Sequence, residues 1–203
     1  MDFFNIFEYS GHMKNSISLK QKLLPLLLVA AVIILDQVTK CLIVNSLSRY
    51  SPFDEDSVIR VIGDYVRIIH VRNPAVAFSL GAALSAGWRY VLFSVLPLIV
   101  IAAVFVIYFR NKDFNSIQRW TICGILGGGL GNLIDRFFRP DGVVDFIDCT
   151  FFGWFGMDRW PTFNVADTAV VICGILFVIS FIIQVKKENM EKSSGSKKEA
   201  SDE

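Results

Sequence analysis

The sequence predicts an all-α membrane protein of four transmembrane helices with a small extracytoplasmic β element. Its 203 residues are 53% hydrophobic, and its mean hydropathy of +0.50 is too high for an ordinary water-soluble domain of this length. A transmembrane helix needs about 20 predominantly apolar residues, and four segments meet this length: Leu23–Val44, Trp88–Tyr108, Ile117–Phe137 and Val165–Val185. The β element is expected at Val61–Val71, where partly alternating β-branched residues predict one or two strands.

The chain divides into a cytoplasmic N-terminal segment (1–22), a four-span unit (23–185) and a cytoplasmic tail (186–203). The four-span unit has outer loops at about 45–87 and 136–164. Polar and aromatic residues precede the first apolar segment, which exceeds the roughly 7–15 residues of a signal-peptide core, so we do not expect it to be cleaved. The tail is rich in Lys, Ser and Glu without apolar periodicity, which predicts disorder.

Basic residues set the predicted orientation, because Lys and Arg are retained on the cytoplasmic side of a membrane. With both termini inside, every lysine except Lys40 falls in an inner segment, and the inner segments carry the higher basic density. The two outer loops then lie on the extracytoplasmic side. The net charge of +1 gives no indication of nucleic-acid binding.

Three aspartates gather at the predicted outer boundary. Asp135 ends the third apolar segment, Asp145 lies in the second outer loop, and Asp167 opens the fourth segment. Ionisable groups beside hydrocarbon are costly and indicate function by default. The third segment also holds the small-xxx-small pairs Gly124/Gly128 and Gly127/Gly131. Helix packing alone would explain these pairs, and close packing would also bring the aspartates together.

Two neighbouring carboxylates suit acid–base chemistry. They cannot both ionise cheaply, so they share a proton over a wide pH range. The ionised group can take a proton from water while the protonated group polarises a peptide carbonyl, and no covalent intermediate forms. The residues alone do not decide which two of the three aspartates react.

Amide and guanidinium groups accompany the aspartates. Asn132 and Arg136 are four residues apart and share a helical face, and Asn164 precedes Asp167 by one helical turn. Such groups can hold a substrate backbone and fix carboxylate rotamers. A single Asn at the start of a helix is most often a cap, and that interpretation stays open for Asn164.

Other polar residues are interpreted more simply. Asp36 and Lys40 lie at i and i+4 in the first segment and predict an internal ion pair, with Lys40 reaching toward the interface. A direct part in the chemistry is the alternative. No metal site is predicted, because His12 and His70 lack a partner at ligand spacing. No Gly-x-Ser-x-Gly elbow is present, and no histidine lies near the aspartates in the sequence.

The second outer loop is strongly aromatic, with Phe151, Phe152, Trp154, Phe155 and Trp160. Aromatic side chains of this kind are typical of the headgroup level of a membrane, where they anchor a protein. Shaping a groove for a lipid substrate is the second possibility.

Two other classes of function compete with a hydrolase. A proton-coupled transporter also uses Asp and Lys within the membrane. These aspartates, however, cluster at one boundary, and only Asp36 and Lys40 could extend a proton relay across the membrane. A structural scaffold whose glycines serve only helix packing would not need three aspartates and two asparagines at one membrane boundary.

At these residues the chain resembles the lipoprotein signal peptidases, the type II signal peptidases of bacteria. The resemblance covers roughly Leu28 to Phe181 and rests on five short blocks in the family's order: Asp36–Lys40 (Asp-x-x-Thr-Lys), Asn73–Ser79 (Asn-x-x-x-Ala-Phe-Ser), Gly131–Arg136 (Gly-Asn-x-x-Asp-Arg), Val143–Phe146 (Val-Val-Asp-Phe) and Phe163–Asp167 (Phe-Asn-x-Ala-Asp).

The resemblance implies a membrane aspartyl endopeptidase without a cofactor, in the bacterial inner membrane, with its active site at the outer face. It would cleave prolipoproteins before a cysteine that carries diacylglycerol, acting as a monomer among membrane lipids. By the family's pattern, Asp145 and Asp167 would be catalytic. The substrate-binding or supporting residues would be Asn73, Asn132, Asp135, Arg136, Asn164, Asp36 and Lys40.

The chain departs from the family pattern in two places. Pro74-Ala75-Val76 follows Asn73 where the family has a glycine, which alters the local turn. The second outer loop is longer, mainly around Phe151–Trp160, which could change the groove without touching the chemistry.

Overall fold

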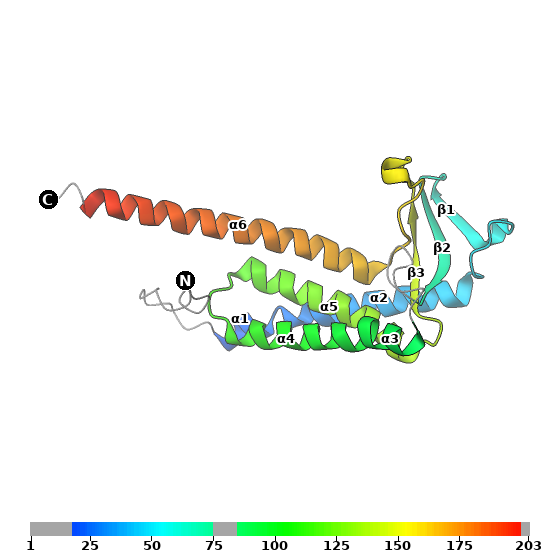
Figure 1. The fold of residues 1–203 in the computed structure, drawn as a ribbon, viewed down its shortest axis with the longest axis horizontal. Helices are drawn as coiled ribbons and strands as arrows, with labels where there is room; N and C mark the ends of the chain where they lie inside the picture. The colour runs from blue at the N-terminus through cyan, green and yellow to red at the C-terminus, as the bar shows by residue number, and fades with distance from the viewer. Residues whose placement is uncertain (1–17, 75–84, 200–203) are drawn as a thin grey trace.

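The computed structural model of the chain describes residues 18–74 and 85–199. It is mostly helical, with a small three-stranded sheet across one end of a helical bundle (Figure 1). The elements are α1 (Leu19–Leu23), α2 (Leu26–Ser46), η2 (Glu55–Ser57), β1 (Val58–Ile62), β2 (Val66–Asn73), α3 (Ala86–Tyr90), η4 (Val91–Val95), α4 (Leu96–Arg110), α5 (Ser116–Phe138), β3 (Val143–Cys149), η5 (Trp154–Gly156) and α6 (Val165–Glu199).

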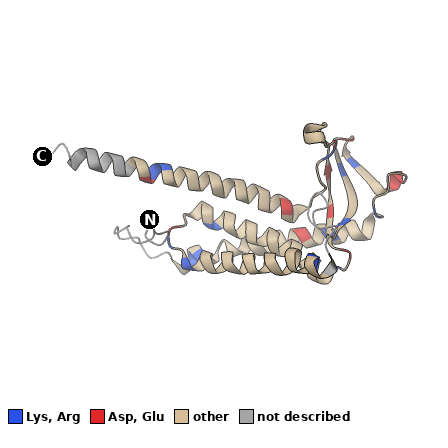
Figure 2. Ribbon diagram, in the orientation of Figure 1, with Lys and Arg blue, Asp and Glu red and all other residues tan. Residues whose placement is uncertain are grey.

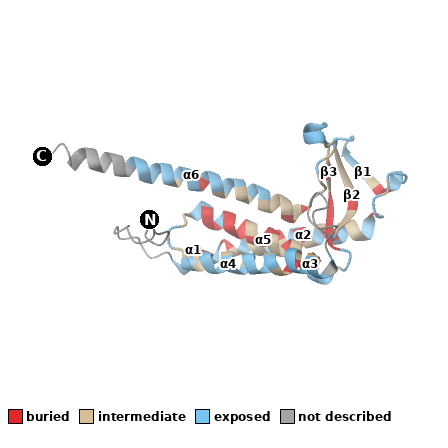
Figure 3. Cartoon of the chain, viewed as in Figure 1, coloured by how far each residue is buried: buried red, intermediate tan, exposed pale blue. Residues whose placement is uncertain are grey.

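Helix α5 is the centre of the bundle. It packs against α6, α2 and α4, and it carries much of the buried surface of the helices (Figure 3). Its glycines make this packing possible: a Cβ at Gly128 would lie 2.7 Å from Cγ2 of Val170, and one at Gly131 would lie 2.8 Å from Oδ2 of Asp36. The predicted close approach of the third and fourth apolar segments is therefore confirmed.

Among the described residues, three helical segments are long and apolar enough to cross a membrane, namely Leu19–Ser46, Gly87–Arg110 and Val165–Met190. They contain three of the four predicted spans. The remaining prediction, Ile117–Phe137, falls on α5, which is 23 residues long but does not meet the same criterion of hydropathy. Its glycines and its polar residues Gln118, Arg119, Asn132 and Asp135 lower its hydropathy.

The sheet is antiparallel with the order β1-β2-β3. The predicted strand region Val61–Val71 forms parts of β1 and β2, joined by a tight turn. The third strand was not predicted. It comes from the second outer loop and places Asp145 opposite Val71, and Val143 opposite Asn73. The sheet thus joins the two predicted outer loops into one unit that covers one end of the bundle.

The C-terminal tail differs from its prediction. Helix α6 continues past Val185 to Glu199, so most of the stretch expected to be disordered is helical. Lys and Glu have high helix propensity, and Gln184 donates a hydrogen bond to Glu188 one turn later (3.0 Å). A helix that is already ordered by its apolar half needs no new nucleation to extend through such residues.

Candidate active site

The predicted acidic residues meet at the end of the bundle nearest the sheet, where α2, α5 and α6 approach β3 (Figure 2). Asp36 comes from α2, Asp135 from α5, Asp145 from β3 and Asp167 from the first turn of α6. Asp36 and Asp135 are fully buried, Asp145 is 3% exposed, and Asp167 is half-buried. The fold therefore collects four carboxylates in one place, away from bulk water.

Lys40 lies among these carboxylates and is fully buried. Its Nζ is 2.8 Å from Oδ2 of Asp36 and 3.1 Å from Oδ2 of Asp135, and it donates to Oδ1 of Asn132 at 2.8 Å. An ammonium group has three N–H donors, and each has an acceptor here. The predicted Asp36–Lys40 ion pair is confirmed, but the prediction that Lys40 reaches toward the interface is wrong, because acceptors on α5 hold it inside.

Asp36 and Asp135 also tie the elements of the site together. Oδ1 of Asp36 accepts the backbone N–H of Ala166 at 3.0 Å, and Oδ2 of Asp135 accepts that of Val144 at 3.0 Å. Asp36 thus fixes the start of α6 against α2, and Asp135 fixes β3 against α5. Both carboxylates also accept hydrogen bonds from Gln37 Nε2, at 3.1 Å each.

Asp145 is held by amides. Asn73 Nδ2 donates to its Oδ2 at 3.0 Å, and Asn164 Nδ2 donates to its Oδ1 at 2.8 Å. Burial raises the pKa of Asp145 to about 6, the hydrogen bond from Asn73 lowers it, and the negative charge of Asp167 adds to the increase. The protonated form of Asp145 is therefore accessible near neutral pH.

Asp167 is held in a similar way. Asn132 Nδ2 donates to its Oδ1 at 2.7 Å, and the backbone N–H of Asn164 donates to its Oδ2 at 3.1 Å. The backbone N–H of Asp167 donates in turn to Oδ1 of Asn164 at 2.9 Å. These reciprocal bonds form a capping box at the start of α6. Asn164 is therefore a helix cap, and its amide also bonds to Asp145.

Lys40 determines how Asn132 faces the aspartates. Oδ1 of Asn132 accepts from Lys40 and from Asn164 Nδ2 (3.1 Å), so Nδ2 of Asn132 must point toward Asp167. A flipped Asn132 amide would turn its N–H donors toward the ammonium group. A buried cation thus fixes an amide orientation that reaches both Asp145 and Asp167.

The four carboxylates divide into two kinds. Asp36 and Asp135 share Lys40, and Asp135 is also 3.3 Å from Nε of Arg139. Among the ion pairs between described residues, none joins a Lys or Arg to Asp145 or Asp167. Arg136 acts on them from farther away: its charge interacts with both, and its guanidinium lies 5.7 Å from the ring centroid of Phe93.

Sequence reasoning missed two residues of the site, Gln37 and Arg139. Gln37 donates to both buried carboxylates and to the carbonyl of Gly131 (3.0 Å), and Arg139 pairs with Asp135. A polar residue beside Asp36 in an apolar helix was the available signal for Gln37. Arg139 follows Asp135 by four residues, but only the fold shows that α5 ends at Phe138 and that Arg139, its C-cap residue, turns back to Asp135.

Some predictions fall outside the site or outside the described residues. Ala75 and Val76, which alter the turn after Asn73, are not among the described residues. Within the described ranges, no cluster of three His, Cys, Asp or Glu side chains is arranged to hold a metal ion.

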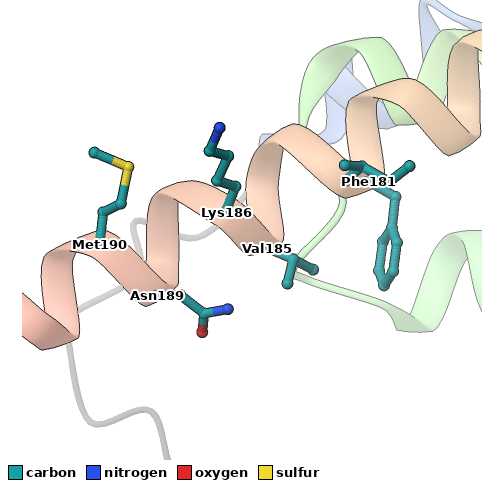
Figure 4. A pocket seen from close by; sticks show the side chains of 6 residues that line it. Phe181, Val185, Lys186, Asn189 and Met190 are labelled. Atoms are coloured by element: carbon teal, nitrogen blue, oxygen red, sulfur yellow. The ribbon is translucent and has the colours of Figure 1, made fainter.

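An open hollow of about 500 Å³ lies on α6, far from the aspartates (Figure 4). All the residues that line it belong to α6, so it is not part of the candidate active site.

Comparison with known proteins decides the family. The sequence model of signal peptidase II matches residues 28–183. This chain belongs to the signal peptidase II family. It is 47% identical over 174 residues to the lipoprotein signal peptidase of Treponema pallidum (strain Nichols), covering 86% of this chain and 91% of that protein. It is 49% identical over 175 residues to that of Treponema denticola, covering 86% of this chain and 98% of that protein.

Solved structures agree with this membership. A bacterial membrane enzyme determined by the in meso method at 2.3 Å resolution superposes with a TM-score of 0.68 at 28% identity, covering 87% of this chain and 96% of that one. The family resemblance inferred from the five sequence blocks is confirmed, and the chain is a membrane-embedded peptidase. The alternative of a proton-coupled transporter has no support in these comparisons.

In this signal peptidase II, we expect Lys40→Met to lower the free energy of unfolding by about 3–5 kcal/mol, because Asp36 and Asp135 would stay buried without their cation. The measurement is denaturant unfolding in detergent. Lys22→Met is the matched control, since Lys22 donates to the carbonyl of Phe109 and forms no ion pair with any described carboxylate. Adding Asp36→Asn to Lys40→Met should recover part of the loss. Equal effects of Lys40→Met and Lys22→Met would contradict this account.

Proposed function

We propose that this peptidase removes signal peptides from prolipoproteins as an aspartic endopeptidase, with Asp145 and Asp167 as its catalytic pair. One observation carries the assignment: Asp145 and Asp167 each accept a hydrogen bond from an asparagine amide, and these two amides are hydrogen-bonded to each other, whereas Asp36 and Asp135 are engaged by Lys40. Asp36 and Asp135 are both paired with a buried cation, whereas no ion pair between described residues engages Asp145 or Asp167.

The pair would work through a water molecule. Asp167, at the positive end of the α6 dipole, takes a proton from water. Asp145, whose raised pKa favours its acid form, donates a hydrogen bond and then its proton to the scissile carbonyl oxygen. The roles reverse as the amine leaves. The reaction needs no covalent intermediate and no cofactor.

The surrounding residues have supporting roles in this proposal. Asn132 and Asn164 hold the two carboxylates in fixed rotamers, and Asn73 hydrogen-bonds to Asp145 from the end of β2. Arg136 lies close enough for its charge to act on both carboxylates and to help hold the substrate backbone. Asp36, Lys40 and Asp135 position the asparagines and β3 and do not touch the reacting atoms.

We propose that α5 also crosses the membrane and is the third of four transmembrane spans. Helices α2, α4 and α6 surround it, so its glycines and polar residues face protein, where lipid does not have to solvate them. Both termini then lie in the cytoplasm. The catalytic pair lies at the outer face of the bacterial inner membrane, where translocated prolipoproteins are found. The enzyme acts as a monomer.

Asp145→Asn and Asp167→Asn should each lower kcat/KM by at least about 10²–10⁴-fold, because an amide keeps the shape of the carboxyl group but cannot exchange its proton. The measurement is cleavage of a lipidated prolipoprotein by purified protein, with thermal unfolding to confirm folding. Asp141→Asn, at an exposed carboxylate near β3, is the control. Near-normal activity of Asp145→Asn together with none in Asp135→Asn would move the pair to Asp135 and Asp167.

The pH profile of kcat/KM should fall above about pH 6 as Asp145 loses the proton that it donates. Asn73→Ala removes a hydrogen bond that favours the ionised form. The pKa of Asp145 should therefore rise, and the alkaline limb should move to higher pH by about one unit. An unchanged limb, or one that moves to lower pH, would show that Asp145 is not the acid.

Thiol labelling in intact cells tests the topology. The four native cysteines are first replaced, and single cysteines are placed at Asp56, Lys112 or Asp141, which are all exposed. A membrane-impermeant reagent should label the positions Asp56 and Asp141 but not Lys112, because α5 crosses the membrane between Lys112 and Asp141. Labelling of Lys112 and Asp141 from the same side would exclude α5 as a span.

The enzyme should cleave a diacylglyceryl prolipoprotein far faster than the same chain with an unmodified cysteine. Burying acyl chains in lipid contributes about 0.8 kcal/mol per CH₂, and anchoring the substrate at the interface aligns its scissile bond with Asp145 and Asp167. Both forms are compared at equal concentration in detergent micelles. Equal turnover of the two forms would mean that the site recognises the peptide and not the lipid.

A further inference from the structure

An exposed group of aromatic side chains projects from the sheet and has no part in the proposed catalysis. We call it the aromatic tip: Tyr65, Phe151, Phe152, Trp154 and Phe155. Tyr65 is 60% exposed, Trp154 67%, Phe152 70% and Phe155 89%. A contiguous apolar patch of this kind is uncommon on a water-exposed surface and indicates a partner.

The backbone of the tip presents these rings outward. Phe152 (φ 57°) and Phe155 (φ 54°) both adopt the left-handed conformation, which is rare for bulky side chains. The rings nevertheless contact one another: Phe151 lies 6.0 Å from Trp154 and 6.3 Å from Phe155, between ring centroids. Strained residues concentrate at functional positions, which distinguishes this loop from an ordinary surface turn.

The tip is attached firmly to the strand that carries Asp145. The backbone N–H of Phe151 donates to the carbonyl of Asp158 at 2.8 Å, and that of Thr150 donates to the carbonyl of Tyr65 at 2.9 Å. At the base of the loop, Nε of Arg159 lies 2.7 Å from Oδ1 of Asp148 on β3. The tip therefore moves with β3.

The position of the tip points to its partner. Figure 1 shows η5 beside the bundle, on the side of α6 and level with the outer end of α6. The apolar segment of α6 begins at Val165, so the tip lies at the level where the membrane boundary meets this helix. Exposed charge at Asp158 and the Arg60–Asp64 ion pair nearby suit the headgroup region better than the hydrocarbon core.

We propose that the aromatic tip inserts into the headgroup region of the outer leaflet and that a lipid surface is its partner. Large aromatic rings prefer this region, and the tip is continuous with the membrane boundary set by α6. Insertion holds β3, and with it Asp145, at a fixed height above the bilayer. The proposal depends on the topology proposed above and not on the cleavage reaction.

Fluorescence quenching by brominated lipid tests this proposal without any measurement of activity. Trp88→Phe, Trp120→Phe and Trp160→Phe together leave Trp154 as the single tryptophan. The protein is reconstituted into phosphatidylcholine vesicles with bromine either near the headgroup end of the acyl chains or near their terminal methyl groups. We expect loss of Trp154 fluorescence, with the greater loss from the shallow bromines. Emission that neither lipid quenches would overturn the proposal.

Two matched variants identify the surface responsible. Phe152→Ser combined with Phe155→Ser should reduce the quenching of Trp154, whereas Phe53→Ser should not, although Phe53 is 97% exposed on the other outer loop. Equal effects of the two would overturn the proposal. Two further results would also contradict the proposal. If added lipidated prolipoprotein shields Trp154 from bromolipid, the aromatic tip is a lid over the substrate. If the tips of two molecules cross-link to each other, the partner of the tip is a second copy of this chain.

Discussion

The buried ammonium group of Lys40 is the interaction on which the rest of the site depends. Burying one ion costs several kcal/mol unless it is paired and fully hydrogen-bonded, and Lys40 meets both conditions through Asp36, Asp135 and Asn132. It neutralises charge, joins α2 to α5 and fixes the orientation of one amide. Through that amide it reaches Asp167, and through Asn164 it reaches Asp145.

The fold places this network where an apolar bundle can hold it. Gly128 lets α5 approach the start of α6, and Gly131 leaves room for the carboxylate of Asp36. The polar side chains at this end of the bundle therefore face one another, although the outward faces of α4 and α6 remain exposed and apolar (Figure 3). The sheet completes the enclosure with a strand from the second outer loop. Asp145 and Asp167, separate in sequence, meet because that strand passes the N-terminus of α6.

Local spacing predicted the parts of the site that lie within one helix. Asp36 and Lys40 form the expected ion pair, and Asn164 and Asp167 share a turn. Strand β3 could not be predicted, because its pairing with β2 is a long-range contact. The roles of Gln37 and Arg139 likewise depend on how the chain packs around Asp135. The helical extension of α6 past Val185 also follows from continuity with its ordered apolar half, which the composition of the tail does not report. The roles of Asp145 and Asp167 in catalysis stay a prediction.

The central claim is that Asp135 is ion-paired with Lys40, whereas Asp145, among amides, can carry a proton. Infrared spectroscopy of the purified enzyme across pH tests this most directly, because a protonated carboxyl group has its own carbonyl stretching band. The account predicts a band that titrates near pH 6 and is lost in Asp145→Asn but kept in Asp135→Asn. A band that survives Asp145→Asn and disappears in Asp135→Asn would contradict it.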